Sequence, residues 1–288
     1  MKICITTPFA FKYYCFKEYQ ECVEGIIDDM RLDADFSFVV YDNGNDPEFS
    51  EELKTWAESL HINIIYYVDP TQHHTIEHTN DYGKCSDRCL QIYKIIFETL
   101  VPEDTDLVFN IEDDTTFPAD SLRKLVDVLK EYPEVITASG VNYNRRLGNL
   151  PIGKPMLWNF DFTFKGNEII DVISRKIMPE KNEGLEFCDA GGLGCWLTRY
   201  PVLREMGWKS YHPLIGGGDL NWGAGLKLRF GTGRFVIDHS IKTKHWYLLN
   251  GIKGYTSVDN KGEEVFAEKP KPKILFPRGV SRVNLQLK

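Results

Sequence analysis

The stretch LVFNIEDDTTFP, residues 107–118, joins a mainly apolar run to three consecutive acids and a proline. A near-continuous apolar run is typical of a strand buried on both faces of a parallel sheet. Negative charges as close as those of Glu112, Asp113 and Asp114 repel one another, and either a bound cation or a solvated turn offsets that cost. Spacing alone leaves both interpretations open, whereas the place of the acids at a strand end favours a cation.

The segments around this strand alternate between strand and helix patterns. β-rich runs that end in polar turn residues lie at 2–8, 36–46 and 62–69, with a further strand pattern at 135–141. Apolar residues recur at helical spacing in 14–30, 50–60, 85–100 and 119–133, with N-cap candidates at Ser50, Asp120 and Ser121. This alternation predicts an α/β fold with a doubly wound, mostly parallel sheet. The irregular region 142–186 fits a hairpin or a mobile loop.

Composition describes an ordinary globular protein of 288 residues, with 42% hydrophobic and 26% charged residues. No apolar run approaches the roughly 20 residues that cross a bilayer, and the first residues lack the apolar core and cleavage site of a signal peptide. We therefore expect a cytoplasmic protein. The seven cysteines are odd in number and scattered, which predicts reduced thiols.

Charge is distributed unevenly along the chain. The net charge is -8, yet residues 241–288 contain ten Lys/Arg against four Asp/Glu. A basic segment of this kind more often serves as a solvated tail, while docking to a polyanion stays open.

Two clusters in the sequence have the composition of metal sites. Carboxylates are hard ligands suited to Mn²⁺ or Mg²⁺, whose shell is commonly completed by substrate phosphates. In open α/β sheets ligands bind at the carboxyl ends of the strands, which is where Glu112 to Asp114 are expected. A second cluster could suggest zinc, but the Cys-x-x-Cys spacing of structural zinc sites is missing from it: His73, His74, His78, Cys85 and Cys89. Helical packing of the two cysteines, with the histidines in a loop, is the favoured interpretation.

Five further motifs, in order along 1–246, resemble those of the GT-A nucleotide-sugar glycosyltransferases, in particular their large inverting branch with an Asp-x-Asp-type motif. The acid motif here is Glu112-Asp113-Asp114 followed by Pro118, with Glu where Asp is commoner. The others are TTP (6–8), YDNGND (41–46), DAGGLGCWLTR (189–199), GGGDLNWGAGLKLRFG (216–231) and KTKHWY (242–247).

The resemblance implies a GT-A (Rossmann-like) fold with a C-terminal extension and a role for each matching residue. Asp219 would be the catalytic base, and the metal ligands would be Asp114, His245 and Glu112. The nucleotide-sugar would contact Thr6, Pro8, Asp42, Asn43, Lys84, Arg88, Glu112, Asp113, Gly191 and Gly192. The implied domains are a catalytic domain (1–250, with a nucleotide-binding half 1–140 and an acceptor half 141–250) and a basic tail (251–288).

Three of these residues also fit purely structural roles. Asp219 follows three glycines and suits a helix N-cap. His245 fits a partly buried strand histidine, and Asp42 in the sequence DNG is a good turn former.

The implied activity is metal-dependent transfer of a sugar, with inversion, from a nucleoside-diphosphate sugar to an acceptor hydroxyl. A glycan or lipid-linked sugar is the favoured acceptor, with aromatic faces for stacking offered by Trp158, Phe160, Trp196, Trp208 and Trp222. A viral-type DNA glycosyltransferase acting on hydroxymethylated pyrimidines is the alternative, because the basic tail would contact phosphates. A nucleotidyltransferase is disfavoured by the lack of glycine after the first strand, and a non-catalytic nucleotide-sugar binding protein would not need Asp219.

Overall fold

A computed structural model describes residues 1–10, 13–42, 46–70, 82–143, 155–166, 168–176, 183–211, 215, 218–249, 252–258 and 264–266, with the side chains of 82–87, 176, 249, 252, 258 and 264–266 left out. Among these residues no helix is both long and apolar enough to cross a bilayer.

The centre of the fold is an eight-stranded mixed sheet in the order β3-β2-β1-β4-β11-β6-β12-β9. Its strands are β1 (Lys2–Phe9), β2 (Asp35–Asp42), β3 (Asn63–Val68), β4 (Leu107–Ile111), β6 (Thr137–Val141), β9 (Leu185–Cys188), β11 (Cys195–Arg199) and β12 (Phe235–Lys242). The first four run parallel to one another, while β11 is antiparallel to both β4 and β6. The predicted mostly parallel sheet is therefore confirmed, with β11 and β9 as the reversed strands.

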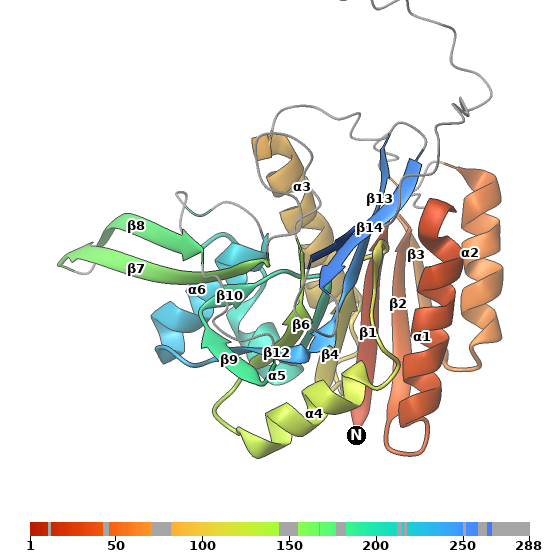
Figure 1. The fold of residues 1–288 in the computed structure, drawn as a ribbon, viewed down its shortest axis with the longest axis horizontal. Helices are drawn as coiled ribbons and strands as arrows, with labels where there is room; N and C mark the ends of the chain where they lie inside the picture. The colour runs from red at the N-terminus through yellow and green to blue at the C-terminus, as the bar shows by residue number, and fades with distance from the viewer. Residues whose placement is uncertain are drawn as a thin grey trace, which may run out of the picture.

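Helices cover both faces of this sheet (Figure 1). One apolar core lies under α1 (Phe16–Met30), α2 (Pro47–Ser59) and α4 (Ser121–Glu131). The other lies under α3 (Tyr82–Ile95), the π-helical turn η2 (Ile96–Leu100), α5 (Tyr200–Met206) and α6 (Gly218–Phe230). A 3-10 turn, η1 (Tyr13–Cys15), leads into α1.

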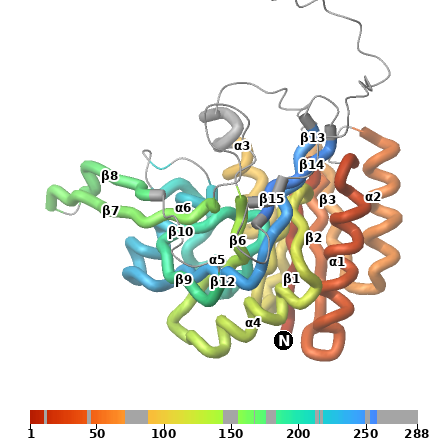
Figure 2. The backbone as a smooth tube through the Cα atoms, viewed as in Figure 1, coloured from red at the N-terminus to blue at the C-terminus, as the bar shows by residue number. Residues whose placement is uncertain are grey.

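Two smaller sheets extend the fold. β10 (Ala190–Gly191) pairs with β7 (Leu157–Lys165), which forms a hairpin with β8 (Glu168–Lys176) that projects from the body. The second sheet has the order β15-β14-β13-β5, and Figure 2 shows its strands crossing in front of the central sheet. Its strands are β5 (Thr115–Thr116), β13 (Lys244–Leu249), β14 (Ile252–Val258) and β15 (Glu264–Phe266). This sheet carries chain from the end of the sequence to the acids after β4, so part of the segment expected as a tail is sheet.

The expected start of the second helix needs correction. Helix α2 begins before Ser50, because Asp46 is the N-cap and its Oδ1 accepts hydrogen bonds from the backbone N–H groups of Glu48 and Phe49, each at 3.0 Å. Cys89 lies in helix α3, as expected, with its side chain exposed. None of the six cysteines that the structure describes forms a disulfide.

Most of the aromatic rings expected to stack on sugars lie in the core instead. Trp196, Trp208 and Trp222 are each no more than 1% exposed and pack on one another at centroid distances near 6 Å (5.9 to 6.3 Å). Phe160 is fully buried, and only Trp158 is half-buried. Their number and size serve the core between the sheet and α6, so the stacking hypothesis is wrong for all but Trp158.

Candidate functional site

The carboxyl ends of three parallel strands bring acidic residues to one edge of the central sheet. Asp42 ends β2, Asp69 follows β3, and Glu112 follows β4. The strand order places β1 between β2 and β4. Because parallel strands end at the same edge, this edge is where a ligand is expected to bind in an open α/β sheet.

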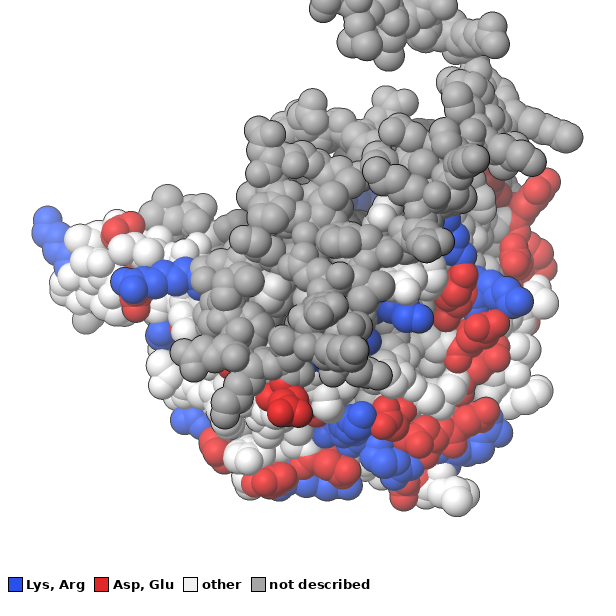
Figure 3. Space-filling model, in the orientation of Figure 1, with Lys and Arg blue, Asp and Glu red and all other residues white. Residues whose placement is uncertain are grey.

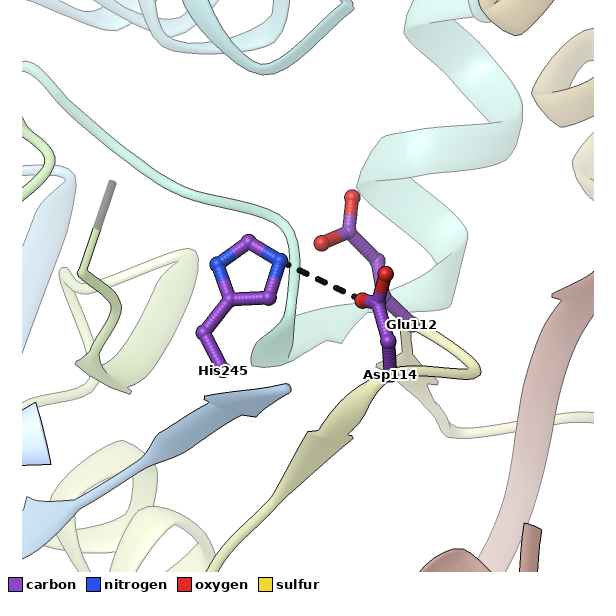
Figure 4. A group of neighbouring side chains, drawn as sticks. All are labelled: Glu112, Asp114 and His245. Atoms are coloured by element: carbon purple, nitrogen blue, oxygen red, sulfur yellow. Dashed lines mark ion pairs between the residues drawn. The ribbon is translucent and has the colours of Figure 1, made fainter. Parts of the chain in front are cut away.

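Three side chains converge at this edge: Glu112, Asp114 and His245 (Figure 4). Their ligand atoms all lie within 4.8 Å of one another, with Glu112 half-buried and the other two buried. His245 arrives on β13, whose register places it opposite Thr115, and the backbone N–H of Trp246 donates to the carbonyl of Asp114 at 2.7 Å. The pairing of β13 with β5 therefore closes the cluster.

The hydrogen bonding of His245 defines which ring nitrogen faces the acids. Nδ1 lies 2.7 Å from the carbonyl oxygen of Tyr143, which can accept a hydrogen bond only from a protonated Nδ1. Nε2 then lies 3.2 Å from Oδ1 of Asp114. In the neutral ring this sets a lone pair against a carboxylate oxygen, so the contact is favourable only if the imidazole is protonated or both atoms ligate a cation. A ring oriented through Nδ1–H to a carbonyl is the usual arrangement of a metal-binding histidine.

The chemistry of this donor set fits a divalent cation. Two carboxylates and an imidazole suit Mn²⁺ and, less fully, Mg²⁺, which prefers oxygen ligands. Glu112 and Asp114 would supply the oxygen ligands, and His245 would supply the nitrogen.

Buried hydrogen bonds between β1, β4 and the chain before β11 hold the end of β4, which leads into the turn with the acids. Thr6 donates through Oγ1 to Oδ1 of Asn110 at 3.0 Å, and Asn110 donates through Nδ2 to the carbonyl of Leu193 at 2.9 Å. Thr6 is fully buried, so it braces the site from within the sheet. Burial, together with the nearby charge of Glu112, raises the pKa of Tyr93, which keeps this phenol neutral beneath the acids.

Asp113 is not one of the three clustered residues and is bonded to the chain after β1. Its Oδ2 accepts a hydrogen bond from the backbone N–H of Ala10 at 2.7 Å, and it is 6% exposed. Asp113 therefore ties the end of β1 to the turn after β4. Pro8 is half-buried on the same strand.

Asp42 lies at the expected strand end and is fully buried. Its Oδ2 accepts a hydrogen bond from the hydroxyl of Tyr66 at 2.8 Å, and burial together with this bond raises the pKa of the Tyr66 phenol. Tyr66 was not expected at the site, although it lies on a predicted strand.

Arg88 is held by an acid that the motifs missed. Its guanidinium forms an ion pair with Oδ2 of Asp69, which also accepts a hydrogen bond from Tyr41 at 2.9 Å. The side chains of Arg88 and Asp69 are 15% and 4% exposed. An acid directly after the third predicted strand repeats the pattern of Asp42, and that signal could have identified Asp69.

Glycines allow close packing beside the acids. A Cβ on Gly194 would lie 2.6 Å from Oδ1 of Asn142 and 2.7 Å from Oγ1 of Thr115. A Cβ on Gly192 would lie 2.9 Å from Cβ of Asn142, and one on Gly191 would meet Phe235 at 2.9 Å. A side chain at Gly191 would therefore collide with the core at Phe235. Side chains at Gly192 and Gly194 would collide with Asn142, and one at Gly194 also with Thr115.

Asp219 lies in the first turn of α6, where its Oδ1 accepts a hydrogen bond from the N–H of Leu220 at 2.9 Å. It is half-buried and is not one of the three residues of the metal-type cluster. Its position suits both a base beside a ligand and an acid that stabilises a helix N-terminus.

Several expected residues lie outside the description. Asn43 and the three histidines of the zinc hypothesis fall among residues that are not described, as do the side chains of Lys84 and Cys85. The zinc hypothesis thus stays a hypothesis.

Comparisons with known proteins give distant likenesses of overall structure. No protein-family model and no curated protein matches the sequence. A crystal structure from STIV aligns over 99% of this chain and 98% of its own, with a TM-score of 0.44 and 10% identity. TarS 1-349 from S. aureus, also solved in complex with UDP-GlcNAc, aligns over 82% of this chain, with a TM-score of 0.45 and 12% identity.

The match to TarS spans 58% of that chain, less than two thirds of its length. A Bacillus anthracis chain described as a glucose-1-phosphate thymidylyltransferase, in complex with a sucrose, aligns over 85% of this chain and 88% of its own, with a TM-score of 0.44 and 9% identity. At such TM-scores and identities these likenesses are too distant to place the chain in a family.

Proposed function

We propose that the protein is a metal-dependent glycosyltransferase that uses a nucleoside-diphosphate sugar. The observation that carries the proposal is the convergence of Glu112, Asp114 and His245 at the carboxyl edge of the parallel strands. Bound Mn²⁺ or Mg²⁺ would offset the negative charge that develops on a diphosphate leaving group. The ordered motifs that resemble the GT-A glycosyltransferases support the same activity.

The remaining roles follow from position. Asp42, at the end of β2, is the proposed contact to the base of the nucleotide. Lys84 is the proposed cation beside the diphosphate, because the charge of Arg88 is already compensated by Asp69. Asp219 would accept the proton of the acceptor hydroxyl as it attacks the anomeric carbon from the opposite face, which inverts the configuration.

The acceptor we favour is a glycan or a lipid-linked sugar. Modified DNA would need a basic surface, and on the described part of the face in Figure 3 positive and negative side chains are interspersed. Around α1 and α4, for example, Arg123 pairs with both Asp29 and Asp33. This mixed charge on the described part of that face favours a glycan over DNA as the acceptor.

The test distinguishes the role of the metal site from that of Asp219 as the proposed catalytic base. Wild type, Asp114→Asn, Asp219→Asn and the surface control Asp127→Asn are assayed with a panel of nucleotide sugars, with Mn²⁺ or EDTA, on glycoside and hydroxymethylated DNA acceptors. Asp114→Asn should lose Mn²⁺ binding together with donor hydrolysis and transfer. Asp219→Asn should keep Mn²⁺ binding and lose transfer by about 10² to 10⁴, the usual contribution of a general base.

Two results would contradict the proposal. Turnover that survives EDTA and Asp114→Asn would mean that the acids are structural. Full transfer by Asp219→Asn, with a lower melting temperature, would leave this residue as a helix N-terminal acid only.

A further inference from the structure

Two threonines lie on either side of His245 in the small sheet. Thr115 on β5 is the register partner of His245 on β13, and His245 is the partner of Thr256 on β14. Residues directly opposite one another in antiparallel strands point to the same face of a sheet. Thr115, His245 and Thr256, here called the threonine row, therefore share the face from which His245 reaches Asp114.

Both hydroxyls of the threonine row are buried polar groups without a hydrogen bond. Thr115 is 1% exposed and Thr256 is fully buried, and Oγ1 of each has no hydrogen-bond partner among the residues that the structure describes. Native proteins pair nearly all such groups, so each exception calls for a reason. On the opposite face, Thr116 has its Oγ1 satisfied by the indole N–H of Trp246 at 2.9 Å. Among the described residues of this sheet, the two buried hydroxyls without a partner therefore both lie on the face that carries His245.

The two hydroxyls can donate hydrogen bonds, which the other groups of the site cannot do. Glu112, Asp114 and the Nε2 of His245 present lone pairs, which can hold a cation but cannot donate to an anion. A hydroxyl supplies one donor, and a phosphate oxygen next to a bound cation is a strong acceptor. Oγ1 of Thr115 lies directly beside Gly194, where an added Cβ would be 2.7 Å from it.

We propose that the hydroxyls of Thr115 and Thr256 donate hydrogen bonds to the diphosphate of the bound nucleotide, so that β14 forms part of the ligand site. This inference rests on the proposed function, because it takes the metal-bound group to be a diphosphate. It also assigns a task to the segment after residue 250, from which Thr256 comes.

The experiment measures two affinities by calorimetry on the full chain: that for Mn²⁺ alone, and that for inorganic pyrophosphate in the presence of Mn²⁺. Pyrophosphate tests binding of the diphosphate alone, without the nucleoside or the sugar. The variants are Thr115→Val and Thr256→Val, which keep the shape and the β-branch, and Thr256→Ser, which keeps the hydroxyl. Thr116→Val, on the opposite face, is the matched control.

Each Val variant should bind pyrophosphate about tenfold more weakly or worse, as expected for losing a hydrogen bond to a charged group, with Mn²⁺ affinity changed less than about twofold. Thr256→Ser and Thr116→Val should bind pyrophosphate as the wild type does. Without ligand, the Val variants should melt at or above the wild-type temperature, since they remove unpaired buried hydroxyls.

Wild-type pyrophosphate affinity in both Val variants would overturn this inference and leave the proposed function intact. An equal loss of Mn²⁺ affinity would also overturn it, because the hydroxyls would then act on the ion. A wild-type protein that binds neither Mn²⁺ nor pyrophosphate would instead refute the proposed function itself.

Discussion

Binding of Mn²⁺ to Glu112, Asp114 and His245 should stabilise the folded chain by an amount that Asp114→Asn removes. A ligand at 100 times its dissociation constant adds about 2.7 kcal/mol to the free energy of unfolding. For a chain of 288 residues the entropy of unfolding is about 0.6 kcal/mol per degree, so the melting temperature should rise by about 4 to 5 °C.

If Asp114→Asn weakens binding about a hundredfold, the same Mn²⁺ concentration adds only about 0.4 kcal/mol, less than about 1 °C. In EDTA the variant should melt within about 2 °C of the wild type, because losing the charge beside His245 is opposed by relief of repulsion from Glu112. Differential scanning calorimetry with and without Mn²⁺ measures both values.

Asp127→Asn is the matched control, because this acid is 63% exposed on α4 and pairs with Lys130 at 3.5 Å. It should keep the full Mn²⁺ shift. The reasoning is refuted if Asp114→Asn keeps a shift of 4 to 5 °C, or if Asp127→Asn loses it.

Three further outcomes are expected. Tyr66→Phe should lower the free energy of unfolding by about 1.5 to 3 kcal/mol in urea titrations, because it takes a donor from the buried carboxylate of Asp42; an unchanged urea midpoint would contradict this. Gly194→Ala should weaken Mn²⁺-dependent pyrophosphate binding and cost about 1 to 3 kcal/mol of stability, since its Cβ would collide with Thr115; wild-type binding would show that the turn yields freely. Burial raises the pKa of Tyr66 and Tyr93, so the folded state holds these protons more tightly than the unfolded chain does. Their contribution to stability is complete below the ordinary tyrosine pKa of about 10 and is lost as the pH rises above it, so tyrosinate absorbance and unfolding should appear together; full ionisation of every tyrosine in a folded chain would refute this.

The sequence by itself determined the order of the elements and the location of the acids. Apolar runs of strand length, separated by segments of helical period, predict β1 to β4 and the helices between them, because these patterns reflect burial within each local segment. The placing of Asp42 and Glu112 at one edge follows, since parallel strands joined by helices end on the same side. The motif that included His245 also indicated a ligand for the ion.

Only the tertiary structure decided which groups meet. The contact of His245 with Asp114 depends on the pairing of β13 with β5, across about 130 residues of sequence, and no local pattern encodes such a register. Together with the pairing of β13 with β14, the pairing with β5 also aligns Thr115 with Thr256, and Thr256 lies in none of the motifs. Only the structure showed that Trp196, Trp208 and Trp222 are buried. The sequence could not decide this, because an aromatic ring suits a core as well as a sugar-binding surface. Long-range strand pairing and packing therefore bring together a site whose acids and histidine the motifs could name but whose contacts they could not define.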